Sequence, residues 1–399
     1  MMRGSLREQP AVTRLSSFPP LRSMKASYWN SIATPHWMTG SALGERCSQR
    51  RSIDSRWGFI RNRRVSGVSY RMHLNQASHA MLSRLKSTRR QFLGAMTATC
   101  ATAPWLGEAQ IKAAPTDSIP LIDCHLHINH FDRTVEDTIR HMDATGTSKA
   151  FVLPLETGEG GVLLRSETVL HAFHAHKDRV IPFCQTDIRR ADVLQRIRAY
   201  HLLGCRGIGE QKEHLPLDDR RVERIIALCD ELDWPITIHF QDGEKGFNQG
   251  LAQHLERYLK KYKKVRIIGH AQTWWAHISA DVPDPAKSLY PKGPVKSGGV
   301  IDKLMTDYPN LYGDMSAGSG YNALSRDEEF TMGFIERHPR QLLFGSDCPC
   351  YDGQGKNFRG MCYSKQLQSF LKRIVKDPGT LRNILHDNAL RAVGEKVPA

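Results

Sequence analysis

Two histidines, His125 and His127, follow the short apolar run 119–122 within the stretch Asp123-Cys124-His125-Leu126-His127. Alternate side chains of a β-strand share a face, so Asp123, His125 and His127 are expected to point the same way. Two imidazoles on one strand can bind a divalent metal without a loop having to be ordered. The carboxyl of Asp123 is then placed to orient the histidines. The spacing predicts the first part of a metal site.

Three later apolar runs, each rich in strand-forming residues, also end in a potential metal ligand. The three terminal residues are His239, His270 and Asp347. If the strands are parallel and close into a barrel, their carboxyl ends share one face and bring these groups together. Imidazole and carboxylate suit Zn²⁺, and also Fe²⁺ or Mn²⁺, with an open position for water.

From residue 119 onward, short β-rich runs alternate with longer amphipathic segments, which is typical of a parallel sheet built from βα units. Eight strands are expected, at 119–124, 148–155, 180–187, 205–211, 234–240, 265–271, 311–316 and 341–347. The expected helices are 134–144, 166–176, 191–203, 220–232, 250–262, 300–308, 328–338, 364–375 and 379–393. Asp218 and Asp219 place acidic groups at one helix start, and Ser325 is expected to cap another. Closure into an α/β (β/α)8 TIM barrel is the economical arrangement, because an open sheet would not gather all strand ends at one site.

This order of ligands resembles the amidohydrolase superfamily, with His-x-His after strand one, His after strands five and six, and Asp after strand eight. The closing stretch 381–391 also resembles the C-terminal helix of the "amidohydrolase 2" branch, and the resemblance spans about 119–394. It implies a TIM barrel with a divalent metal that acts on a small-molecule substrate. The branch contains many hydrolases and some decarboxylases.

The resemblance implies that His125, His127, His239 and Asp347 are metal ligands. Asp347 would also accept the proton of the attacking water and pass it to the leaving group. His270 would either bind a second metal or hydrogen-bond the substrate carbonyl. Zinc is the expected metal, with iron and manganese as alternatives, and one ion is favoured over two.

Glu210 and Lys212 follow predicted strand four and are two residues apart, so they share a face. The family pattern favours Glu210 as a ligand or near neighbour of the metal, since binuclear relatives have a bridging group there. Lys212 would lie nearer the rim and contact an anionic substrate group. The alternative is a salt bridge between the two side chains or with a neighbour.

Four further residues are candidate substrate contacts. Trp274 and Trp275 open a long insertion, 273–299, and could form the wall of a pocket for a planar or sugar-like substrate. Packing of the insertion onto the barrel is their favoured alternative. Asn322 and Arg326 follow the glycine-rich turn after strand seven and are the other two candidates.

The charge of the chain is concentrated in its first hundred residues. Residues 1–97 carry 17 Lys+Arg and three acidic residues, a net +14, which leaves 39 basic and 38 acidic residues in the remainder. The overall charge of +15 therefore belongs to the leader. The nearly neutral catalytic part gives no case for a nucleic-acid partner.

The stretch 87–93, which contains Arg89 and Arg90, resembles the twin-arginine export motif. The segment after it is too short and too polar to span a membrane stably, so 81–114 is expected to be a cleaved signal peptide. The Tat export machinery would then be a partner, and the mature protein, 115–399, would be periplasmic or secreted. Residues 1–80 are expected to be a disordered basic leader, with translation beginning at Met81 or Met72. A chance Arg-Arg pair in a basic tail is the alternative.

Three of the nine cysteines, Cys348, Cys350 and Cys362, lie close together in the sequence. A zinc site and a disulfide are alternatives for them. Packing as small thiols is favoured, because no Cys-x-x-Cys pair supports structural zinc. His141, on a predicted helix, is expected to be a surface or packing residue.

The complete ligand set predicts a metal-dependent hydrolase that cleaves an amide, ester or lactone bond with metal-activated water. The alternative is a non-hydrolytic, metal-dependent decarboxylase of an aromatic or unsaturated acid on the same scaffold. A secreted binding protein that has lost turnover is disfavoured by the intact ligands. Related barrels often form homodimers, and the sequence leaves the oligomeric state open.

Overall fold

The computed structural model describes residues 119–128, 132–159, 163–284 and 288–398. The expected leader 1–80 and signal peptide 81–114 lie outside these residues. None of the helices in the described ranges is long and apolar enough to cross a membrane.

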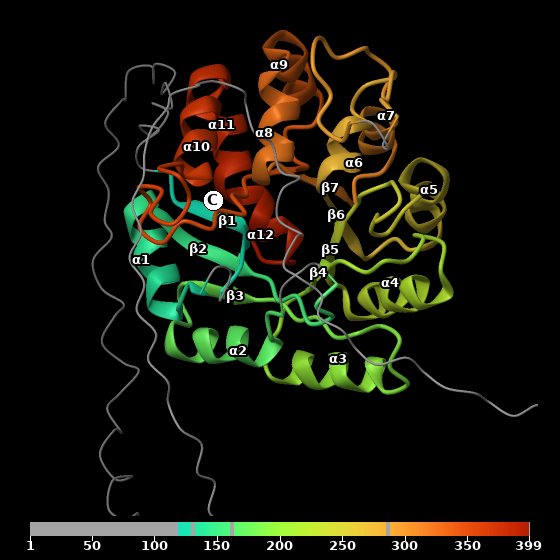
Figure 1. The fold of residues 1–399 in the computed structure, drawn as a ribbon, viewed down its shortest axis with the longest axis vertical. Coiled ribbons are helices and arrows are strands. Elements are labelled where there is room, and N and C mark those ends of the chain that lie inside the picture. Colours follow the sequence, from blue (N-terminus) through green and yellow to red (C-terminus); the bar gives the residue numbers. More distant parts are fainter. Residues whose placement is uncertain (1–118, 129–131, 160–162, 285–287, 399) are drawn as a thin grey trace, which may run out of the picture. The chain divides into compact units, whose positions relative to one another are not determined.

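Eight parallel strands form the centre of the fold (Figure 1). They are β1(Leu121–Leu126), β2(Thr147–Val152), β3(Val180–Pro182), β4(Ile208–Gln211), β5(Pro235–His239), β6(Arg266–His270), β7(Leu311–Asp314) and β8(Leu342–Leu343). Pairing runs in chain order in two sheets, β1-β2-β3 and β4-β5-β6-β7-β8.

Two sets of backbone contacts close these sheets into a barrel. A parallel bridge joins Cys184, just past β3, to Ile208 of β4. On the other side, the Cys124 amide of β1 donates to the Phe344 carbonyl at 2.9 Å. The expected (β/α)8 barrel is confirmed, and all eight strands lie within the expected stretches or extend them by one or two residues. Strand eight is the shortest, so Asp347 lies on the loop that follows it rather than on the ladder.

The helices follow the strands and lie outside them, and in Figure 1 α1 to α5 run from the left of the fold, along its lower edge, to the right. They are α1(Val135–Thr145), α2(Ser166–Ala175), α3(Val193–Leu202), α4(Arg220–Leu232), α5(Leu251–Lys261), α6(Gln272–Ala276), α7(Val300–Asp307), α8(Ala317–Ser325), α9(Glu328–Arg337), α10(Tyr363–Ile374), α11(Pro378–Arg382) and α12(Asn388–Ala392), with a π-helical turn, η3(Asn383–Asp387), between the last two. The predicted helix 379–393 is therefore three short pieces.

One capping prediction holds and one is wrong. The Asp219 carboxylate accepts from the Arg221 amide and caps α4, as expected of an acidic residue at a helix start. Ser325 is the last residue of α8 and its hydroxyl donates to the Tyr321 carbonyl at 2.7 Å. The residue that caps α9 is Asp327, whose side chain accepts from Phe330.

The insertion after β6 begins with the short helix α6, and its two tryptophans are 0% and 1% exposed. The ring of Trp274 lies directly against Gly269 of β6, where an added Cβ would come within 2.0 Å of Cε3. Only glycine fits at that position. The Trp275 indole donates to the Asp314 carbonyl at 3.0 Å and so fixes α6 to β7.

Candidate metal centre

The two histidines at the end of β1 have fixed tautomers. His125 Nδ1 lies 2.7 Å from Asp314 Oδ2, and His127 Nδ1 lies 2.6 Å from the Leu153 carbonyl oxygen. Because a carboxylate and a carbonyl only accept hydrogen bonds, both Nδ1 atoms carry the proton. Each neutral imidazole therefore presents a lone pair at Nε2.

These two lone pairs face each other across 3.1 Å, with both rings buried. Carboxylate oxygens close the same space, since Glu210 Oε2 is 3.4 Å and Asp347 Oδ1 3.6 Å from His127 Nε2. With both imidazoles neutral, these four groups only accept, and a further proton on His125 or a bound cation is needed to satisfy them. Their convergence fits a cation, and imidazole with carboxylate is a donor set that zinc, iron and manganese accept.

The electrostatics of His125 express the same need for positive charge. Burial lowers the pKa of His125, but the carboxylates of Asp314 and Asp347 outweigh burial and raise it well above its usual value. The negative charges around His125 thus favour a positive charge at this position. That charge is a proton on the ring when the site is empty and a metal ion when one is bound.

Glu210 lies between two pairs of histidines. Its Oε2 faces His125 and His127, whereas its Oε1 is 2.5 Å from His239 Nδ1 and 3.7 Å from His270 Nε2. Burial raises the pKa of Glu210, but Lys212 and the surrounding histidines hold it well below its usual range. The carboxylate is therefore ionised, with one oxygen turned to each pair.

Asp314 of β7 holds two of the rings from behind. Its Oδ2 accepts from His125 Nδ1, from His270 Nδ1 at 2.9 Å and from the Ser316 hydroxyl at 2.8 Å. A carboxylate on the outer nitrogen of a metal-binding histidine fixes its tautomer and orientation. Sequence reasoning gave Asp314 no role; its alternation with Ser316 at the end of a predicted strand was the available signal.

Asp123, in contrast, does not touch the imidazoles it was expected to orient. Its Oδ1 accepts from the backbone amides of His125 at 3.0 Å and Ser346 at 2.9 Å. Burial raises its pKa to about 6. Asp123 thus ties the end of β1 to the loop after β8, and it acts on the site through the backbone.

Asp347 is the most accessible of the candidate ligands. Its side chain is 22% exposed, whereas those of His125, His127 and Glu210 are at most 3% exposed. Its backbone is in the left-handed region at φ 48°, and its amide donates to the His125 carbonyl at 2.8 Å. That hydrogen bond places the carboxylate at the mouth of the cluster.

The six predicted ligands form three overlapping groups, in each of which the ligand atoms lie within 4.8 Å of one another. The groups are His125/His127/Glu210, His125/His270/Asp347 and Glu210/His239/His270. The structure thus brings together every residue that the sequence analysis offered as a ligand. Whether they hold one ion or two depends on how Glu210 is shared.

The predicted substrate contacts divide into one near the cluster and four away from it. Lys212 lies at the rim, with its ammonium 5.3 Å from the centre of the Phe247 ring. Trp274 and Trp275 are buried in packing contacts and expose no ring face. Asn322 Nδ2 donates to Pro291 O and Arg326 Nη1 to Gly293 O, both at 3.1 Å, so they fasten α8 to the insertion.

Two tyrosines that the sequence analysis did not name lie closer to the mouth. Asp347 interacts electrostatically with both Tyr290 and Tyr363. Burial, reinforced by the negative charge of Asp347, raises the pKa of Tyr363 to about 12. Both phenols therefore stay protonated and can donate hydrogen bonds beside Asp347. Nothing in their sequence spacing pairs them with a strand end.

Comparison with known proteins identifies the family of the chain. A family model described as amidohydrolase matches residues 122–394. Similar solved structures include an uncharacterised TIM-barrel protein from Bordetella bronchiseptica, at 16% identity and TM-score 0.47, covering 64% of this chain and 81% of that one. A probable 2-pyrone-4,6-dicarboxylic acid hydrolase from Acinetobacter baumannii has 14% identity and TM-score 0.49. The match covers 69% of this chain and 99% of that one.

A third similar structure is 5-carboxyvanillate decarboxylase from Sphingomonas paucimobilis, at 10% identity and TM-score 0.46, with 70% of this chain and 100% of that one covered. Identities this low say nothing about the substrate. The comparison with curated proteins finds no match. Because the family model covers well over half of the sequence, the chain belongs to the amidohydrolase family and is an enzyme of that superfamily.

Proposed function

We propose that the protein is a metal-dependent hydrolase that cleaves an amide, ester or lactone bond of a small molecule. The observation that carries this proposal is the position of Asp347, an ionised carboxylate at the accessible side of a cluster of buried metal-binding groups. A bound divalent ion, zinc in the first place, would supply hydroxide by lowering the pKa of water to about 7.

The residues of the chain have separate roles in this proposal. Asp347 accepts the proton of the attacking water and returns it to the leaving group, the task of a positioned general base. His270 faces the cluster through Nε2 and, when protonated there, donates to the substrate carbonyl, with Asp314 stabilising the charged ring. Lys212 and the phenols of Tyr290 and Tyr363 are donors for an anionic or carbonyl group at the mouth.

The number of ions follows from Glu210. One ion held by His125, His127, His239 and Asp347 is the expected state, with Glu210 as its neighbour. Glu210, His239 and His270 form a second group that fits another ion, and Glu210 would then bridge the two. Plasma mass spectrometry of wild type and of a His125→Ala/His127→Ala/His239→Ala/His270→Ala variant, which removes the histidines of both groups, gives the number as the difference in metal per chain.

Isotope labelling separates hydrolysis from decarboxylation. Metal-loaded enzyme is incubated in ¹⁸O-water with a panel of lactones, esters, amides and aromatic acids. Hydrolysis incorporates ¹⁸O into the product acid and releases no CO2 from the substrate. Metal-dependent CO2 release with no label in the product would instead establish the decarboxylase. A ligand that binds without turnover would favour the binding protein.

We also propose export through the twin-arginine pathway, which rests on the motif at 87–93 alone. An Arg89→Lys/Arg90→Lys variant should remain in the cytoplasm while the parent chain is recovered from the periplasm. Equal export of both would contradict the proposal.

A further inference from the structure

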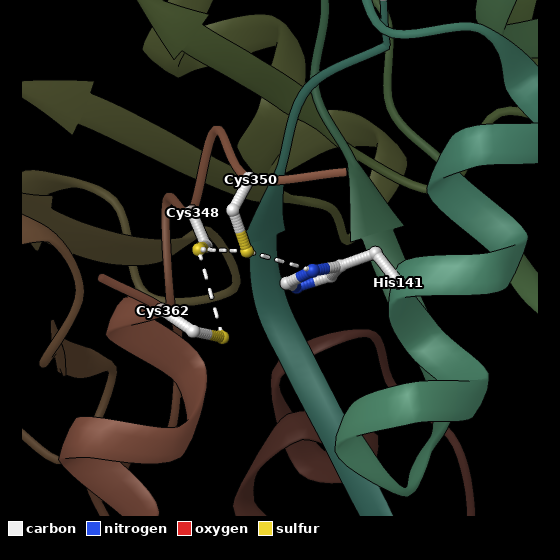
Figure 2. A group of neighbouring side chains, drawn as sticks. All are labelled: His141, Cys348, Cys350 and Cys362. Carbon is white, nitrogen blue, oxygen red and sulfur yellow. Dashed lines mark hydrogen bonds between the residues drawn. The ribbon is translucent and has the colours of Figure 1, made fainter. Parts of the chain in front are cut away.

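A second group of metal-binding side chains lies outside the active site. Figure 2 shows His141, Cys348, Cys350 and Cys362 with their ligand atoms turned toward one another. They come from three segments: α1 contributes His141, the loop after β8 contributes Cys348 and Cys350, and Cys362 directly precedes α10. His141 thus meets three cysteines that lie more than 200 residues further along the chain.

The ligand atoms all lie within 4.8 Å of one another, close enough to share one ion after a small opening of the Cys348–Cys350 pair. Cys348 Sγ lies 3.3 Å from Cys350 Sγ and 3.9 Å from Cys362 Sγ, and Cys350 Sγ lies 3.4 Å from His141 Nδ1. With zinc–sulfur bonds of about 2.3 Å, tetrahedral geometry places two sulfurs about 3.8 Å apart. All three thiols are free, and only Cys362 is more than marginally accessible.

A buried cation beside the cluster gives an independent indication. The guanidinium of Arg133 is fully buried. The charges of Asp123 and Asp347 act on it from a distance, and no carboxylate of the described residues forms an ion pair with it. Instead it donates to the carbonyls of Cys348, Cys350 and His127. A buried charge is costly unless a counter-charge lies nearby. Three thiolates around one divalent ion carry a net charge of −1, which would offset Arg133.

We propose that His141, Cys348, Cys350 and Cys362 form a structural zinc site of the Cys3His type, separate from the catalytic centre. All four positions are filled by protein, so the site has no open position for water or substrate, as in structural zinc sites. Binding of the ion displaces the three thiol protons, and no redox step is involved.

The site has a defined task in the fold. Residues 351–362 form neither helix nor strand and half of them are exposed, with Asn357 and Arg359 at positive φ. Such a segment has few apolar contacts to hold it. An ion bound at both of its ends and to α1 fixes the segment, and with it Asp347, which directly precedes Cys348. The zinc site would thereby position the general base of the proposed reaction.

The test separates the two centres by spectroscopy. The full chain, purified with reductant, is studied as His125→Ala/His127→Ala/His239→Ala/His270→Ala, which removes the four histidines of the catalytic cluster. We expect about one zinc per chain to remain, with X-ray absorption showing three sulfurs at about 2.3 Å and one nitrogen. The zinc should be lost in Cys350→Ser and in His141→Leu but retained in His141→Cys. Cys229→Ser, which removes a buried thiol of α4, is the matched control.

A measurement on the unmodified chain guards against variants that fail to fold. Titration with a mercurial in the presence of a zinc indicator should release one ion as the clustered thiols react. Two results would overturn the proposal: no sulfur-bound metal in either experiment, or a disulfide joining two of the three cysteines in peptides from chain prepared under reductant.

Discussion

The two clusters of metal-binding side chains meet at the peptide bond between Asp347 and Cys348 and differ in chemistry. The first has histidines and carboxylates at the ends of buried strands, with Asp347 exposed at its mouth. The second has three sulfurs and one nitrogen, and every ligand position is provided by the chain. An open nitrogen–oxygen set suits catalysis, whereas a closed sulfur-rich set suits structure. The loop after β8 thus carries the proposed general base, Asp347, directly next to a proposed zinc ligand, Cys348.

The largest effect is expected where the two clusters differ most, at the open carboxylate. Asp347→Asn keeps the size of the side chain but removes its ability to accept a proton. We expect kcat to fall by about 10²–10⁴-fold, the usual contribution of a general base. The measurement is steady-state kinetics on a substrate identified by the labelling experiment.

Sulfur-bound zinc in Asp347→Asn should be unchanged, which X-ray absorption can verify. If the variant lost that zinc while keeping most of its turnover, the division between an open catalytic and a closed structural cluster would be wrong.

The side chain of Arg133 touches both clusters, through His127 O on one side and the carbonyls of Cys348 and Cys350 on the other. Arg133→Met fills similar volume but leaves three carbonyls without a donor. We expect the free energy of unfolding to fall by about 3 kcal/mol. Urea denaturation of the metal-loaded chain measures this. A change under 1 kcal/mol, about one ordinary hydrogen bond, would show that Arg133 does not join the two regions.

The catalytic cluster was far easier to predict from the sequence than the sulfur cluster. Hydrophobic runs end in His125, His239, His270 and Asp347, and a barrel sends every strand end to one face, so local pattern and topology together place the ligands. His141 has no such signal. It is one histidine of a helix, more than 200 residues from the cysteines, and only tertiary packing brings it to them.

Supporting residues were missed for a related reason. Asp314 acts through contacts across the barrel, which sequence alone does not reveal. Packing of Trp274 onto the barrel was the favoured expectation and agrees with its burial, although its close approach to Gly269 could not be foreseen. The Ser325 cap was wrong because Asp327, two residues later, competes for the same helix start.

Asp314 tests whether the catalytic cluster depends on its outer contacts. Asp314→Asn removes the charge that holds His125 Nδ1 and His270 Nδ1. Loss of such a contact costs about 10–100-fold in metal affinity or activity. Competition with a chelator should detect the weaker binding, while the sulfur site keeps its metal. Asp302→Asn, which breaks a contact with His338 on the outer helices, is the control and should leave both sites unchanged.

The smallest effect concerns Glu213, a buried carboxyl near the catalytic cluster that belongs to neither metal site. It accepts from the amides of Gln185, at 3.1 Å, and Gln211. Burial, reinforced by the nearby charge of Glu159, raises the pKa of Glu213 well above its usual value. The folded state therefore holds a proton that the unfolded state has released, so the free energy of unfolding falls as pH rises through this interval. Metal sites have the opposite effect, so that stability rises with pH, because ligands that bind metal give up protons on folding.

Glu213→Gln should remove this fall in the free energy of unfolding with rising pH, because an amide does not titrate. Its amide can keep both neighbours if the Gln211 amide turns over, since Gln211 Oε1 has no partner among the described residues. The variant should gain stability over wild type between pH 5 and pH 8, by at most about 1.4 kcal/mol per pH unit. Urea midpoints across that range, with exposed Glu231→Gln as control, measure the difference. If the difference in stability between variant and wild type does not vary with pH, Glu213 is ionised throughout. Stability would then not fall with rising pH at Glu213, and the contrast with the metal sites would be wrong.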